Sequence, residues 1–84
     1  MRIPKEPDEG IEHDFRMTPT RISAKKLGAS WIVYEQTPDA VVDRRIICFR
    51  PDWEEGFKAG ARFVAVLDGK TIEQAMADGI LAHG

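Results

Sequence analysis

The sequence predicts an α+β fold: an antiparallel β-hairpin of two or three strands, followed by two C-terminal helices that pack on one face of it. Residues 30–36 and 44–50 are rich in β-branched and aromatic side chains, as strands are. The link between them, residues 37–43, is too short for the crossover that joins parallel strands, so the pair is expected to be antiparallel. The second half of the chain spaces its apolar residues three and four apart, which is the period of an amphipathic helix.

Length and composition predict a tail and one domain. The chain has 84 residues, of which 43% are hydrophobic and 31% charged, a balance typical of globular proteins. Residues 1–14 hold two prolines, a glycine and five acidic side chains but few apolar ones, so they are predicted to form a flexible acidic tail. Residues 15–84 are predicted to form a single small domain with a thin core and a stability margin of roughly a few kcal/mol.

Residues 15–27 allow two interpretations. Pro19 excludes a continuous helix through this segment. The apolar residues up to Ile22 favour short extended pieces, whereas Ser23 could cap a single helical turn that Gly28 closes. The sequence leaves both open.

A long helix is predicted to begin after Asp52, because Asp52 and Glu55 have the spacing of a capping box. The residues that share one face of it are Trp53, Phe57, Gly60, Val64 and Leu67. Gly56 and Gly60 weaken this helix or mark a close approach to the sheet. The alternative ends the helix at Gly60 and makes residues 62–67 a third strand, since good strand formers occur there; the long helix is favoured.

Gly69 is predicted to end that element, and Thr71 to cap a last helix over residues 72–82. Its apolar face consists of Ile72, Ala75, Met76, Gly79 and Ile80. The expected core of the whole domain is Trp31, Val33, Ile46, Cys48, Trp53, Phe57, Val64, Leu67, Ile72, Met76 and Ile80.

The Gly-Lys-Thr at residues 69–71 follows an apolar run and precedes a helix, as in phosphate-binding loops. Such a loop needs small residues before this triplet, so that several backbone N–H groups can point at the phosphate. Residues 64–68 are bulky or acidic instead. A turn followed by a helix cap is therefore the better interpretation.

The histidines and the cysteine also predict no reactive site. Cys48 is the single cysteine, so neither an intramolecular disulfide nor a multi-cysteine zinc site can form. A nucleophilic thiol needs a nearby base, and both histidines, His13 and His83, lie towards the chain ends. The acid-histidine-acid triplet at residues 12–14 is interpreted as part of a solvated tail. We therefore expect no catalysis, no cofactor and no bound metal.

Charge is the most informative surface property. Residues 1–14 carry a net charge of −3, residues 15–50 carry +4 and residues 51–84 carry −3. Arginine, tyrosine and tryptophan often anchor protein interfaces. The residues predicted to form a partner surface on the basic strands are Lys25, Lys26, Tyr34, Arg44, Arg45 and Arg50.

These observations favour a small non-enzymatic interaction protein that binds a surface on a larger protein or complex, as an inhibitor, adaptor or regulatory subunit. Compact acidic single-domain chains without motifs often work this way, including many that phages encode. The alternative is a nucleic-acid-binding accessory protein that uses the basic strands, against which stands a sequence pI of about 5.6. Self-pairing into a homodimer is also left open. The lone cysteine, and the absence of a signal peptide or an apolar run of membrane-spanning length, predict a cytoplasmic location and no membrane partner.

Overall fold

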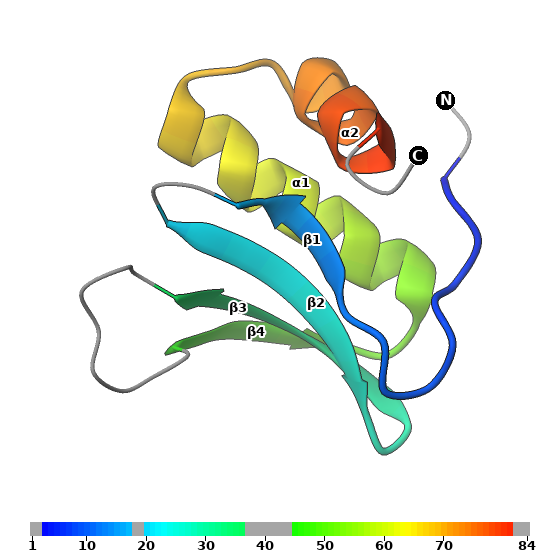
Figure 1. The fold of residues 1–84 in the computed structure, drawn as a ribbon. Coiled ribbons are helices and arrows are strands. Elements are labelled where there is room, and N and C mark those ends of the chain that lie inside the picture. Colours follow the sequence, from blue (N-terminus) through cyan, green and yellow to red (C-terminus); the bar gives the residue numbers. More distant parts are fainter. Residues whose placement is uncertain (1–2, 18–19, 37–44, 82–84) are drawn as a thin grey trace.

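The computed structural model describes residues 3–17, 20–36 and 45–81. Four strands precede two helices (Figure 1). The elements are β1 (His13–Arg16), β2 (Arg21–Leu27), β3 (Ser30–Gln36), β4 (Arg45–Arg50), α1 (Trp53–Asp68) and α2 (Ile72–Leu81). The predicted link at 37–43, Arg44 and the predicted end of the last helix at residue 82 lie outside the described residues.

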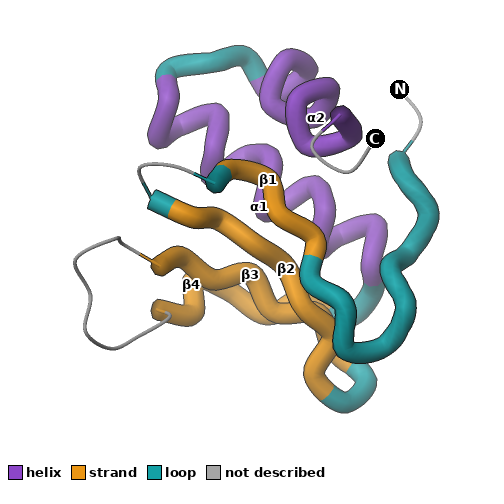
Figure 2. The backbone as a smooth tube through the Cα atoms, viewed as in Figure 1, coloured by secondary structure: helices purple, strands orange, loops and turns teal. Residues whose placement is uncertain are grey.

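The strands form one antiparallel sheet in the order β1-β2-β3-β4. The sheet curves around α1, and α2 packs beside α1 and β1 (Figures 1 and 2). The predicted α+β fold, with two C-terminal helices packed on a sheet, is confirmed. The sheet is larger than the predicted hairpin, because β1 and β2 add two strands to it.

For residues 15–27 the extended interpretation is right and the helical turn is wrong. Strand β2 runs through the whole of residues 21–27, in register with β3 from Arg21 opposite Gln36 to Leu27 opposite Ser30. Strand β1 begins at His13, inside the segment predicted to be a tail, because the side chains of His13 and Phe15 are buried against the helices.

The long form of the first helix is confirmed. Arg62 and Val66 are exposed whereas Ala61, Val64 and Ala65 are buried, which is helical rather than strand periodicity. Gly69 ends the helix in the left-handed conformation, at φ +67°, and its N–H group donates to the carbonyl of Ala65.

The two glycines on α1 let it lie close to the sheet, as one of the two interpretations of them predicts. A Cβ atom on Gly56 would lie 3.0 Å from Cβ of Trp31. A Cβ atom on Gly60 would lie 2.4 Å from two ring atoms of Phe15. Helix and sheet therefore approach closely where the chain has no side chain to separate them.

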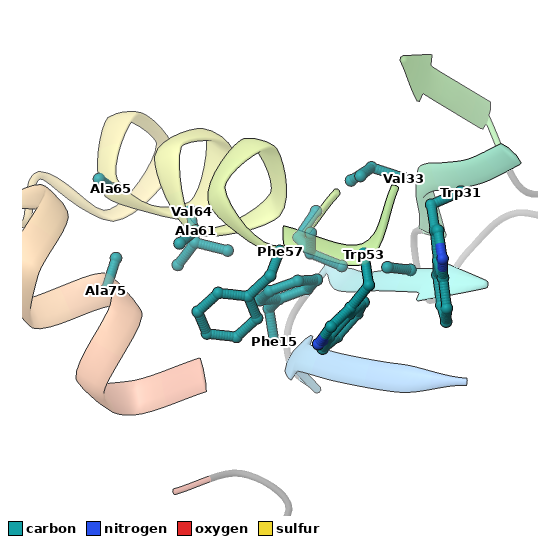
Figure 3. Packing of buried hydrophobic residues seen from close by; sticks show 11 residues of the cluster. Phe15, Trp31, Val33, Trp53, Phe57, Ala61, Val64, Ala65 and Ala75 are labelled. Atoms are coloured by element: carbon teal, nitrogen blue, oxygen red, sulfur yellow. The ribbon is translucent and has the colours of Figure 1, made fainter. Parts of the chain in front are cut away.

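The core lies between α1 and the inner face of the sheet (Figure 3). Its buried residues are Phe15, Ile22, Ala24, Trp31, Val33, Trp53, Phe57, Ala61, Val64, Ala65 and Ala75. Of the predicted core, Cys48, Met76 and Ile80 are only partly buried against this cluster. Ile46, Leu67 and Ile72 are exposed, so their prediction is wrong. Ile46 points away from the helices, and the other two flank the turn between α1 and α2.

The domain is as compact as a typical folded chain of its length. Its radius of gyration is 11.8 Å, close to the value of about 12 Å that is typical of a folded chain of this length. Within the described part of the chain, neither helix combines the length and the hydropathy needed to cross a membrane.

Asp52 caps α1 as predicted, since its Oδ1 accepts a hydrogen bond of 2.9 Å from the backbone N–H of Glu55. We expect Asp52→Ala to lower the free energy of unfolding by about 1 kcal/mol, because that N–H group loses its partner. Asp52→Asn should lose much less, since its side-chain oxygen can accept the same bond. Urea denaturation of the three chains tests this. Equal losses in both variants would show that the cap does not stabilise the helix.

Candidate protein-binding surface

The two faces of the sheet differ. Both helices cover the inner face, whereas the outer face carries its own small layer of side chains. Ser23, Ile32 and Tyr34 point outward, since their neighbours Trp31 and Val33 point to the helices. All three are nevertheless buried. This layer therefore gains its cover from neighbouring side chains rather than from a helix.

Strand β4 supplies part of that cover and stays exposed itself. Phe49 lies opposite Ile32, and Ile46 lies opposite Tyr34. Phe49 is 55% exposed and Ile46 is 49% exposed. Two large apolar side chains thus face solvent on a strand at the edge of the sheet.

A bulge in β4 turns two neighbouring apolar side chains, Ile47 and Cys48, towards α1. Val33 pairs with Cys48 and Tyr34 pairs with Ile46, so Ile47 is the extra residue in the ladder. Ile47 and Cys48 consequently both line a cavity against α1, although they are adjacent in sequence. Strand β4 therefore carries apolar side chains on both faces: Ile46 and Phe49 on the outer face, and Ile47 and Cys48 on the face towards α1.

This cavity, which we call the edge groove, has a volume of about 360 Å³ and lies between β4 and α1. Its lining residues are Ile47, Cys48, Arg50, Ala59, Arg62, Phe63 and Val66. Most are apolar, and Val66 is 80% exposed. A concave apolar surface bordered by polar groups is the usual form of a binding site.

Two arginines give the edge groove a positive charge. Among the residues that the structure describes, Arg62 makes no ion pair, and Arg50 donates a hydrogen bond of 2.7 Å to the carbonyl of Phe49. Arg45, further along β4, is instead paired with Glu35. The charge of the lining residues Arg50 and Arg62 is therefore available to a carboxylate from outside the domain.

The structure does not gather the predicted partner residues into one patch. Lys25 lies opposite Ile32 on the outer face, whereas Lys26 lies opposite Trp31 on the inner face. Tyr34 is fully buried, Arg45 is exposed and Arg50 lines the edge groove. Arg44 falls outside the described residues. A partner surface formed by these residues stays a prediction. Arg50 is the residue of this set that lines the edge groove.

Sequence reasoning missed the α1 side of the groove. A signal for it was present, since residues 63–67 are five consecutive apolar side chains in an amphipathic helix. No helix can turn five consecutive residues to one face, so some of them had to face solvent. Val66 and Leu67 are the ones that do.

The acid-histidine-acid triplet at residues 12–14 is structural, and its interpretation as part of a solvated tail is wrong. His13 is buried with its ring against those of Phe15, Trp53 and Phe57.

Its two acids hold Arg21. Asp14 Oδ1 accepts bonds from Arg21 Nε at 3.0 Å and from Ser23 Oγ at 2.5 Å, and Glu12 accepts from Arg21 Nη2 at 2.8 Å. The hydrogen bond with Asp14 raises the pKa of Arg21 above its ordinary value. These bonds join the β1 end of the sheet to β2.

The remaining reactive groups are placed as follows. Cys48 is a free, half-buried thiol in the edge groove. Within residues 3–17, 20–36 and 45–81, no group of three or more histidine, cysteine or acidic side chains is placed to hold a metal ion.

Comparison of the chain with protein-family models, with curated proteins and with solved structures finds no match in any of the three.

Proposed function

We propose that this chain is a non-enzymatic interaction protein, an inhibitor, adaptor or regulatory subunit, that binds a segment of a larger protein in the edge groove. The observation that carries the proposal is the groove itself: an apolar cavity of about 360 Å³ on an exposed sheet edge, bordered by Arg50 and Arg62.

The chemistry of the groove defines the partner. Phe63 and Val66 favour apolar side chains on the bound segment, and the two arginines favour carboxylates beside them. Strand β4 has six residues, so a partner segment of similar extent would span about 20 Å along it. The expected ligand is therefore a short acidic segment with a few apolar side chains.

A second copy of this chain is a poorer occupant. Two β4 strands laid side by side would bring Arg50 and Arg62 of both copies to one interface. Close like charges oppose association. The nucleic-acid alternative also has less support, because Lys25 and Lys26 face opposite sides of the sheet and Arg45 is paired with Glu35.

Selection of random displayed peptides on the immobilised protein tests the proposal. We expect the enriched peptides to combine aspartate or glutamate with apolar residues. Arg62→Glu should weaken their binding at least about tenfold, because a charge-assisted contact becomes a repulsion. The same variant used as bait should select basic residues in place of acidic ones.

Lys70→Glu is the matched control, since Lys70 lies in the turn between α1 and α2, pairs with Asp78 and does not line the edge groove. It makes the same charge change and should leave both affinity and selection unchanged. An Arg62→Glu chain that selects the same acidic peptides with the same affinity would rule out the groove as the binding site.

A further inference from the structure

The two tryptophans of the chain form a second surface, and the chain itself covers it. Trp31 comes from β3 and Trp53 begins α1. Their ring centroids are 4.8 Å apart, at an interplanar angle of 51° (Figure 3). Both are buried although they lie at one end of the core, where residues 3–8 pass the N-terminal end of α1 (Figure 1).

Residues 3–8, which we call the covering segment, are held by hydrogen bonds from the two indole N–H groups, as a bound peptide would be. Trp53 Nε1 donates to the carbonyl of Pro4 at 2.7 Å, and Trp31 Nε1 donates to Glu6 Oε1 at 3.1 Å. Residues 3–8 form neither helix nor strand, and Pro4 and Pro7 restrict their backbone to extended conformations. Aromatic surfaces whose polar groups bind carbonyls are a recurring means of recognising proline-containing extended peptides.

The domain holds both tryptophans by contacts other than those with this segment. Trp31 is paired with Lys26 and Arg50 in the sheet, and Gly56 of α1 lies against it. The ring of Trp53 also contacts those of His13 and Phe57, at centroid distances of 5.2 and 5.6 Å. The site should therefore persist when the segment leaves.

The site also has room beyond its present occupant. A cavity of about 410 Å³ adjoins Glu6 and both tryptophans. Its remaining lining residues are Lys26, Ala29, Pro51, Asp52 and Glu54. Lys26 is basic, whereas Asp52 and Glu54 are acidic. The preference for a carboxylate at the place of Glu6 therefore comes from the N–H group of Trp31 rather than from the charge of the lining. The edge groove shares no lining residue with this cavity.

A short turn tethers the segment to the sheet. The N–H group of Ile11 donates to the carbonyl of Asp8 at 2.9 Å, and Gly10 adopts φ +86°, which favours glycine. Strand β1 follows at His13. A tether this short keeps the segment at a high effective concentration over the site, so an outside ligand must compete with it.

We propose that the pair Trp31 and Trp53 is a second peptide-binding site, which takes an extended segment with a proline two residues before a glutamate from a partner protein. Residues 3–8 of the chain occupy it and give way to that partner. The site goes beyond the function proposed for the edge groove, and either can fail without the other.

A synthetic peptide of residues 3–9, added to the full-length chain, tests this inference. Glu6→Ala in the chain removes the hydrogen bond with Trp31 and should weaken the binding of the covering segment to the two tryptophans. We expect the peptide to shift both indole Nε1–H NMR resonances of this variant saturably towards their wild-type positions. Its apparent affinity should be about tenfold higher for the variant than for the wild-type chain, and a peptide with alanine for Glu6 should lose about tenfold.

Glu9→Ala is the matched control, because Glu9 is exposed in the same stretch of chain, and it should behave as the wild type does. The absence of any saturable shift in Glu6→Ala at millimolar peptide would overturn the proposal. Equal affinity for both chains would place the peptide elsewhere and overturn it as well. A dimer, seen by light scattering and abolished by Glu6→Ala, would assign the site to a second copy instead of a partner.

Discussion

Phe57→Ala is expected to unfold a large share of the molecules at room temperature. Phe57 is fully buried, and its ring centroid lies 5.3 Å from that of Phe15 and 5.6 Å from that of Trp53. Truncation of a core phenylalanine costs about 3–5 kcal/mol. That equals much of the margin of a domain this small, roughly 5 kcal/mol. Circular dichroism against urea should show a transition that begins near zero denaturant.

Phe49→Ala is the paired control, because it removes the same atoms from an exposed position of β4. It should lower the free energy of unfolding by less than about 1 kcal/mol. If both variants lose the same stability, then the outer face of the sheet is as important to the fold as the core.

Gly60→Ala should also destabilise the protein, although alanine is the better helix former. The added Cβ would lie 2.4 Å from ring atoms of Phe15, which is buried and cannot move aside freely. Overpacking of this kind costs about 1–3 kcal/mol or more, which exceeds the gain of about 1 kcal/mol in helix propensity. Urea denaturation should show a net loss.

A double-mutant cycle with Phe15→Leu separates the two contributions. The smaller side chain frees space beside Gly60, so Gly60→Ala should cost clearly less in that background than in the wild type. An unchanged cost would mean that the contact with Phe15 is not the reason why a glycine is required there.

The helices could be predicted because their signals are local. Asp52, Glu55 and the spacing of Trp53 and Phe57 specify α1 within a few residues of sequence. The sequence leaves the strand state of residues 21–27 open and places the start of β1 in a tail, since Pro19 lies between the two segments and Lys25 and Lys26 conceal the alternation of β2. The strand state of both segments depends on burial against α1, which is a tertiary effect.

The candidate site was harder to predict for the same reason. Which face of β4 meets the helices depends on its pairing with β3 and on the bulge at Ile47. That bulge places Cys48 in the groove and Ile46 outside it. Strict alternation along the strand would put Ile46 and Cys48 on one face, and so assigns both to the core. Arg50 was predicted from charge alone, whereas Arg62 enters the site only through the position of α1.

The most direct test of the proposed function is to locate a selected acidic peptide on the chain by NMR. Intermolecular nuclear Overhauser effects should join peptide protons to the methyl groups of Ile47 and Val66, on the two walls of the edge groove. Effects confined to methyl groups of α2, such as those of Ile72 and Ile80, would show that the groove between β4 and α1 is not the surface that binds.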